Sequence, residues 1–263
     1  MADDLRLYFF SCGSLKSEAQ YIWMNEGLGE PSEIPVPFFL ITHPRGNVLF
    51  DGGNALEVAQ NARAHWDAVV DVYEPHMTED DFVVNQLQNM DVDPASVRYV
   101  VQSHLHLDHS GAVGHFPNAE YVVQRRELEY AYTPDWFQKP AYIRPDFDRD
   151  VDWLFLDAEN DDGYDLYGDG TLKMLFTPGH APGHTSLIVT LEETGPVMLT
   201  ADACYTMNHY NNEALPGLIH SAHDVAASVQ KIHRAVDALG ATVVTGHDPD
   251  EWPSFKKAPE YYS

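Results

Sequence analysis

Cysteine and basic residues are both scarce in this sequence. Its two cysteines among 263 residues, Cys12 and Cys204, are too few for a disulfide framework. A small cross-linked secreted domain is therefore excluded, and reduced thiols fit the cytoplasm. Lysine and arginine number 15 against 41 aspartates and glutamates, a formal net charge of −26. Such a surface repels phosphate groups, so we expect neither nucleic acid nor an anionic membrane as a partner.

Long apolar runs and linker-like stretches are also missing. No basic segment followed by an apolar one opens the chain, and no apolar run is long enough to span a bilayer. We therefore expect a soluble, cytoplasmic protein. No low-complexity tract or fixed-period repeat divides the sequence, and its length suits one large α/β unit with a substantial core. We predict a single domain over residues 1–263.

Histidine, in contrast, is concentrated in one dense run. Residues 104–109 read His-Leu-His-Leu-Asp-His and follow residues 97–102, with Ser103 between; residues 97–102 have the composition of a buried strand. Side chains two apart on an extended chain point the same way, so His104 and His106 can bind one metal ion together. The Asp-His pair after the turn can face a second ion. Imidazole and carboxylate ligands suit zinc, with cobalt, iron or manganese as alternatives, and favour a hydrolytic site over a thiolate structural one.

Further candidate ligands lie downstream. A site for two ions needs more ligands than the histidine run supplies. Open α/β sheets tend to place their sites at the C-terminal ends of strands. Three suitable residues each follow an apolar, strand-like run: His180 after residues 172–176, Asp202 after residues 197–200 and His247 after residues 242–245.

This pattern resembles that of the metallo-β-lactamase-fold hydrolases, which have a His-x-His-x-Asp-His loop followed by separate His, Asp and His ligands. Within that superfamily the sequence closely resembles the quorum-quenching N-acyl-homoserine lactonases, nearest to the branch that also opens γ-butyrolactone. The similarity runs from about residue 5 to residue 262, and the Asp-Ala-Cys-Tyr run at residues 202–205 narrows it to the lactonases. Other matching segments are residues 38–44, 50–54, 177–184 and 245–248.

The resemblance implies a fold and a set of metal ligands. The fold would be an αββα sandwich, in which two mixed sheets pack face to face with helices outside, whereas periodicity alone predicts only an α/β protein. Two divalent ions, zinc in the first instance, would be held in two groups that one carboxylate bridges. The groups are His104, His106 and His180 for the first ion, Asp108, His109 and His247 for the second, and Asp202 between them.

The same resemblance implies a mechanism for opening a lactone ring. A hydroxide shared by the two ions would attack the carbonyl carbon. The Tyr205 hydroxyl would stabilise the oxyanion, and Asp108 would deliver a proton to the leaving alkoxide. An ordinary packing role is the alternative for Tyr205.

Two residues near the ligands have two interpretations each. Asp51 follows a short strand and either orients a ligand histidine or is a turn residue before two glycines. His184 either packs behind the ligands or replaces His180 as one of them. The family's ligand is the first histidine after Thr-Pro-Gly, which favours His180.

We predict a metal-dependent hydrolase of carboxylic esters, specifically an N-acyl-homoserine lactonase. The alternatives are a γ-butyrolactone or other small-lactone catabolic lactonase, a glyoxalase II-like thioesterase and a non-enzymatic metal-binding module. Such a thioesterase usually adds a C-terminal substrate domain, for which little sequence follows His247. A metal-binding module would need no open coordination position.

Apolar residues in irregular segments are candidates for holding an acyl chain. Trp23 and Met24 lie in a turn-rich N-terminal segment, and Trp136 and Phe137 lie in a proline-rich loop. Their side chains line a substrate pocket, form a homodimer interface or pack in the core.

Two helices have clear start signals. Residues 78–81 resemble a capping box, which predicts one helix with Phe82, Val83, Leu87 and Met90 inward. A second helix is predicted to begin near Ser221, with Asp224 as its capping partner, and to end at Gly240. Its apolar stripe comprises Val225, Val229, Ile232, Val236 and Leu239.

Overall fold

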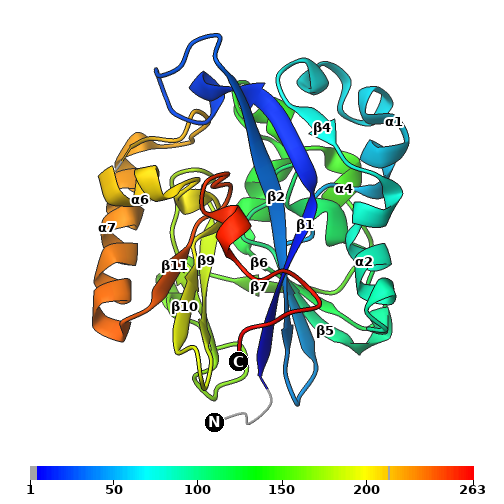
Figure 1. Ribbon diagram of the computed structural model, residues 1–263, viewed down its shortest axis with the longest axis vertical. Coiled ribbons are helices and arrows are strands. Elements are labelled where there is room, and N and C mark those ends of the chain that lie inside the picture. Colours follow the sequence, from blue (N-terminus) through cyan, green and yellow to red (C-terminus); the bar gives the residue numbers. More distant parts are fainter. Residues whose placement is uncertain (1–4, 213) are drawn as a thin grey trace.

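Two β-sheets form the centre of the computed structural model, which describes residues 5–212 and 214–263 (Figure 1). The larger sheet has the strand order β4-β1-β2-β3-β5-β6-β7 and the smaller one β11-β10-β9-β8. The strands of the larger sheet are β1 (Arg6–Glu18), β2 (Pro31–Thr42), β3 (Asn47–Phe50), β4 (Glu74–His76), β5 (Val97–Val101), β6 (Glu120–Gln124) and β7 (Trp153–Leu156). Those of the smaller sheet are β8 (Leu172–Phe176), β9 (Thr185–Thr190), β10 (Pro196–Leu199) and β11 (Thr242–Val244).

Helices cover the outer faces of both sheets, with α1, α2 and α4 beside the larger sheet and α6 and α7 beside the smaller one (Figure 1). The α-helices are α1 (Leu56–Trp66), α2 (Val83–Asn89), α3 (Arg125–Tyr132), α4 (Arg144–Phe147), α5 (Ala158–Asp161), α6 (Met207–Asn212) and α7 (Ala222–Leu239). Short 3-10 turns at Ser110–Ala112, Lys139–Ala141 and Ala201–Ala203 lie in the loops that build the site.

Alternating side chains on the strands create the layers. On β1, Leu7 and Phe9 pack in the cluster between the two sheets, whereas Tyr8 and Phe10 pack in the cluster with α1 and α2. Successive residues of a strand point to opposite faces, so each strand serves two apolar layers. In the same way, Met198 of β10 turns outward to the buried face of α7. The result is the predicted αββα arrangement.

The two helix predictions had different outcomes. Ser221 caps α7 by accepting a hydrogen bond from the Asp224 backbone N–H at 3.3 Å, and Gly240 ends the helix at φ 64°, both as predicted. The apolar stripe was wrong at its end, because Leu239 is 47% exposed beyond the packed cluster.

The predicted helix after Thr78 was wrong in its continuity. The capping box is present, but it opens only a 3-10 turn over Glu79–Asp81. Phe82 is extended (φ −65°, ψ 137°) and buried, which interrupts the helical backbone. α2 begins at Val83, one residue after this break.

The strands that precede the candidate ligands share directions within each sheet. β3 and β5 run parallel, and so do β10 and β11, while β8 and β10 both run antiparallel to their common neighbour β9. Their C-terminal ends therefore meet at one edge of the sandwich, where the loops carrying polar residues converge. Among the described residues, no helix has the length and apolar character needed to cross a membrane.

Candidate metal centre

Three histidines converge as the first donor group. His104 and His106 follow β5, and His180 follows β8; all three are buried. The Nε2 atom of His180 lies 3.1 Å from Nε2 of His104 and 2.8 Å from Nδ1 of His106. Three ring nitrogens therefore face one point, and the predicted first group is brought together.

The opposite nitrogen of each ring is held by a hydrogen bond. His106 donates from Nε2 to the Gln138 side-chain oxygen at 3.0 Å, and His180 donates from Nδ1 to the Leu218 carbonyl at 2.9 Å. Nδ1 of His104 lies 2.9 Å from the Ser103 hydroxyl. Because the outer nitrogens carry the protons in these bonds, the inner nitrogens present lone pairs, as metal ligands must.

A second donor group lies beside the first and comprises Asp108, His109 and His247. Nε2 of His109 is 3.7 Å from Asp108 Oδ1, and Nε2 of His247 is 3.6 Å from Asp108 Oδ2. The outer nitrogens are again bonded, with His109 Nδ1 2.8 Å from Asp51 Oδ2 and His247 Nδ1 2.8 Å from the Pro35 carbonyl.

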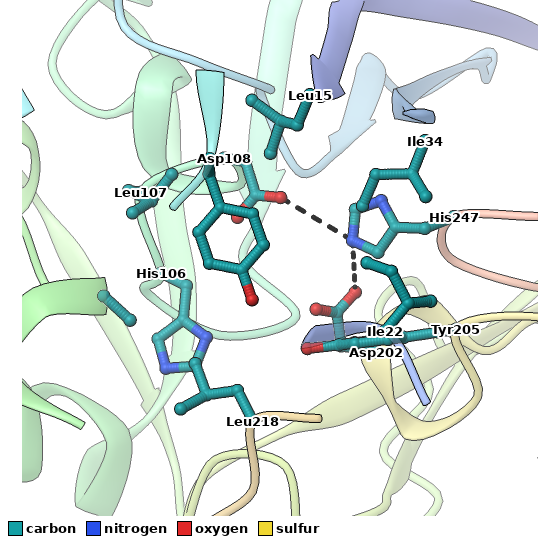
Figure 2. A pocket seen from close by; sticks show the side chains of 12 residues that line it. Leu15, Ile22, Ile34, His106, Leu107, Asp108, Asp202, Tyr205, Leu218 and His247 are labelled. Carbon is teal, nitrogen blue, oxygen red and sulfur yellow. Dashed lines mark ion pairs between the residues drawn. The ribbon is translucent and has the colours of Figure 1, made fainter. Parts of the chain in front are cut away.

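Asp202 stands between the two groups, and Figure 2 shows His247 between its carboxylate and that of Asp108. Its Oδ1 atom faces the second group, 3.0 Å from His247 Nε2 and 3.3 Å from His109 Nε2. Its Oδ2 atom faces the first group, 3.2 Å from His180 Nε2. The preceding residue, Ala201, has φ +44°, a strained conformation that turns the chain sharply after β10.

The donor set fits divalent cations. His109 Nε2 and Asp202 Oδ1 are fully buried and make no hydrogen bond among the described residues. Buried polar atoms without partners are costly, and imidazole lone pairs that face one another cannot satisfy each other. A cation at each group would satisfy all of them, and a mixed set of nitrogen and carboxylate oxygen donors is typical of zinc and related metals.

Burial and neighbouring charges shift the pKa values of these groups in different directions. Burial lowers the pKa of both His106 and His180 to about 3, which keeps their rings neutral. For Asp202, burial raises the pKa, but His247, His109 and His180 lower it more, to well below its usual range. Burial would lower the pKa of His109, but Asp202, Asp108 and Asp51 raise it well above normal. The second group therefore attracts positive charge strongly.

Asp51 orients ligands from behind, as one of its two interpretations proposed. Besides His109, it accepts hydrogen bonds at 2.7 Å from both the backbone N–H and the hydroxyl of Ser103. Since that hydroxyl donates to Asp51, it accepts from Nδ1 of His104. One carboxylate thus holds a histidine of each donor group. Ser103 was not among the predicted site residues, although its position directly before His104 could have indicated a supporting role.

Close backbone packing holds the histidine loop on this aspartate. The Gly52 N–H donates to the His109 carbonyl, and the Gly111 N–H donates to the Gly53 carbonyl, both at 2.9 Å. A Cβ atom on Gly52 would lie 2.1 Å from that of Ala112, so a side chain has no room there. Glycine is required at position 52 because two segments of the backbone approach each other closely there.

Glu127 joins the two loops of the first group, and no sequence signal indicated it. This fully buried α3 residue accepts hydrogen bonds from the backbone N–H groups of Leu105 at 3.1 Å and Gly183 at 2.9 Å, and from the Tyr142 hydroxyl at 3.0 Å. Burial raises its pKa, and the three donors lower it in part. A glutamate in the first turn of a helix looks like a surface residue until its partners are known.

His184 lies outside both donor groups. Its Nδ1 donates to the Thr177 carbonyl at 3.0 Å, and its Nε2 accepts the backbone N–H of Asp202 at 3.1 Å. Both ring nitrogens are therefore occupied, and the residue supports Asp202 from behind.

Tyr205 borders the first group. Its hydroxyl lies 3.3 Å from Nδ1 of His180, whose proton is already directed at the Leu218 carbonyl. Burial, together with Asp202, raises the pKa of Tyr205 well above its usual value. The phenol therefore stays protonated and can donate to a bound molecule.

The donors open onto a cavity with apolar walls, here called the site cavity (Figure 2). Its apolar lining comprises Leu15, Ile22, Ile34, Tyr73, Leu107 and Leu218. A second cavity of about 250 Å³, here called the outer cavity, shares Tyr73, Leu107, Ala141 and Leu218 with it. The two spaces therefore adjoin, and the outer one is also lined by Val69, Val72, Phe137 and Pro140.

Trp23, Met24, Trp136 and Phe137 were the apolar candidates for holding an acyl chain, and three of them do not line the outer cavity. Of the four, only Phe137 lines the outer cavity. Trp136 is 85% exposed, and the ring of Trp23 stacks on His209. Trp23 and Met24 line a separate hollow. Of the three alternatives, lining of the outer cavity does not apply to these three residues, and core packing applies to Trp23, which packs against the core cluster. Neighbouring side chains in an irregular segment face different ways, which composition does not reveal.

Comparison with known proteins identifies the family of this chain. The Metallo-beta-lactamase superfamily profile matches residues 32–247. N-acyl homoserine lactonase AttM of Azorhizobium caulinodans is 59% identical over 260 residues, covering 98% of this chain and 99% of that protein. N-acyl homoserine lactonase AttM of Agrobacterium fabrum is 55% identical over 261 residues, covering 99% of each.

A solved structure has the same overall fold. It is an N-acyl homoserine lactone hydrolase with N-hexanoyl-L-homoserine at its catalytic metal centre, and it matches with a TM-score of 0.88 at 28% identity over 98% of both chains. The chain therefore belongs to the metallo-β-lactamase superfamily and, within it, to the N-acyl homoserine lactonase family. The predicted fold and family are confirmed.

Proposed function

We propose that this protein hydrolyses the lactone ring of N-acyl homoserine lactones to N-acyl homoserines. The observation that carries the proposal is a buried set of five histidines and two aspartates that opens onto apolar cavities. Its 55–59% identity to N-acyl homoserine lactonases over nearly the full length supports the substrate class.

The ligands of the two ions would be the two donor groups. His104, His106 and His180 would hold one ion, and Asp108, His109 and His247 the other. Asp202 would serve both, since its two oxygens face different groups at 3.0–3.3 Å. Two zinc ions per chain suit these donors best. When bound, the ions supply Lewis acidity and a water molecule of lowered pKa.

Tyr205 and Asp108 are the chain's own catalytic groups in this proposal. The Tyr205 phenol donates a hydrogen bond to the lactone carbonyl oxygen as negative charge develops there, and its raised pKa keeps the proton in place. Asp108 borders the site cavity, takes up the proton that the attacking water loses, and delivers it to the ring oxygen that leaves when the ester bond breaks.

The acyl chain occupies the outer cavity in this proposal. The lactone ring sits in the site cavity, and the chain passes Leu107 and Tyr73, which both cavities share. Each buried methylene would stabilise binding by about 0.8 kcal/mol.

Both cysteines are free and buried, which supports a cytoplasmic setting.

The test is a series of lactones given to metal-reconstituted protein. We expect kcat/KM to rise with acyl-chain length and to exceed that for γ-butyrolactone. If γ-butyrolactone matched or surpassed every acylated substrate, the protein would be a small-lactone catabolic enzyme instead. Elemental analysis of the same preparation should approach two metal equivalents per chain, and full activity at one equivalent would contradict the two-ion arrangement.

A further inference from the structure

Gln138 touches two residues of the first donor group. Its side chain is completely buried, its oxygen accepts the His106 Nε2 proton at 3.0 Å, and its amide group donates to the His180 carbonyl at 3.2 Å. This amide therefore sets which nitrogen of His106 faces the donor group and also holds the backbone of His180.

The short segment after Gln138 makes two more contacts with the histidine loop. The Ala141 carbonyl accepts the Leu107 backbone N–H at 2.9 Å. The Tyr142 ring stands edge-on to His106, with centroids 4.6 Å apart. Residues 138–142 thus form one continuous segment that contacts His106 and its neighbour Leu107.

The same segment forms a wall of the outer cavity. Phe137, Pro140 and Ala141 line that space, and Ala141 also lines the site cavity. An apolar group in the outer cavity therefore presses on the residues that carry Gln138. A small lactone without a chain leaves Phe137 and Pro140 untouched, since these two line the outer cavity only.

We infer that Gln138 is a positioning residue, through which the acyl chain in the outer cavity steadies His106 in the first donor group. The coupling runs from Phe137 and Pro140 through Gln138 to the imidazole. The substrate part of this inference rests on the proposed function. The part concerning His106 stands on the contacts of Gln138 alone.

The first experiment uses metal without substrate. Co²⁺ is titrated into metal-free protein, with visible absorption and chelator competition as readouts. Gln138→Met keeps the length of the side chain but removes both hydrogen bonds, and we expect Co²⁺ affinity to fall about 10- to 100-fold at one site. Gln138→Glu keeps the acceptor for His106 but loses the donor to the His180 carbonyl, so its Co²⁺ affinity should fall less than that of Gln138→Met. A loss in Gln138→Glu equal to that in Gln138→Met would overturn the role toward His106, even if the methionine variant folded poorly.

The matched control is Gln102→Met. Gln102 is buried as well, and neither atom of its side-chain amide has a hydrogen-bond partner among the described residues. We expect Co²⁺ affinity to be unchanged in this variant. An equal loss in both methionine variants would show a general effect of removing a buried amide and would refute positioning by Gln138.

The second experiment tests the coupling at saturating metal. For N-hexanoyl-homoserine lactone, Gln138→Met should lower kcat about 10-fold with little change in KM, and for γ-butyrolactone kcat should fall by a smaller factor, because no acyl chain then contacts Phe137 and Pro140. Equal losses for both substrates would overturn the coupling. If the natural chain failed to hydrolyse any acylated lactone while Gln138→Met still lost Co²⁺ affinity, the proposed function would be wrong and the role of Gln138 toward His106 would stand.

Discussion

Two buried arrangements of histidine and aspartate differ in how their nitrogen atoms are used. In the pair of His65 and Asp146, one ring nitrogen meets one carboxylate oxygen at 2.7 Å. Among the described residues, no third histidine, cysteine or acidic donor joins that pair. In the metal centre, the outer nitrogens are bonded to Gln138, Leu218 and similar partners, and the inner nitrogens converge on each other.

This contrast separates a structural pair from a cation site. The hydrogen bond that His65 donates to Asp146 raises the pKa of His65, so the pair balances its own charge. In the first donor group, burial lowers the pKa of His106 and His180 to about 3, so their lone pairs stay available. A histidine therefore indicates a metal site when its outer nitrogen has a separate acceptor and its inner nitrogen has none.

The strongest way to break the metal centre is to remove the shared carboxylate. Asp202→Ala should lose both metal ions and reduce activity far more than about 100-fold, because both groups face this side chain. Elemental analysis and lactone hydrolysis measure the two effects. Asp146→Asn is the control and should keep its metal. Retention of two equivalents by Asp202→Ala would show that the carboxylate is not a ligand.

Removing one hydroxyl should separate chemistry from metal binding. Tyr205→Phe leaves the donor groups intact and takes away one hydrogen bond to the carbonyl oxygen, so kcat should fall on the order of 100-fold. Metal content and Co²⁺ absorption should stay as they are. Unchanged kcat and KM across several lactones would mean that Tyr205 only packs.

Weakening the support behind the ligands should have a smaller effect. Asp51→Asn preserves shape but loses the carboxylate that holds His109 and, through Ser103, His104. Metal affinity should fall about 10- to 100-fold, measured by competition with a chelator. A fall in affinity confined to the ion of the second group would show that the link through Ser103 to His104 does not affect metal binding.

The smallest effect on activity is expected from the structural pair. His65→Gln removes the partner of a buried carboxylate and should lower the free energy of unfolding by about 3 kcal/mol, measured by urea denaturation. Because the folded-state pKa of His65 is raised, this stabilisation is present at and below a pH of about 6.5 while Asp146, whose own pKa burial raises, stays ionised, and it declines as pH rises through the raised value of His65. Metal content and kcat should not change, and a difference that grew with rising pH would contradict this account.

Sequence patterns located the donors because each depends on local order. The spacing within residues 104–109 and the position of His180, Asp202 and His247 after apolar runs are visible along the chain, and the structure brings all seven predicted residues together. The resemblance supplied the sandwich, which periodicity alone did not specify.

The supports behind the donors were not predictable from local patterns. Glu127 and Gln138 act through partners 22 to 56 residues away in the chain, and nothing in their immediate neighbours distinguishes them from surface residues. Trp136 shows the converse: a large apolar residue in a loop was a candidate for lining a pocket, but its side chain is 85% exposed. Side-chain direction in irregular segments depends on packing that only the folded chain defines.

The origin of the donors in two different sheets has a mechanical consequence. The loop after β5 belongs to the larger sheet, whereas His180, Asp202 and His247 follow strands of the smaller one. Each donor group combines residues from both, so an ion at either position is a cross-link between the halves of the sandwich. Its binding free energy then adds to the cohesion of the two halves, in proportion to the logarithm of free metal over the dissociation constant. Metal binding at these positions would thus raise the free energy of unfolding as well as support activity.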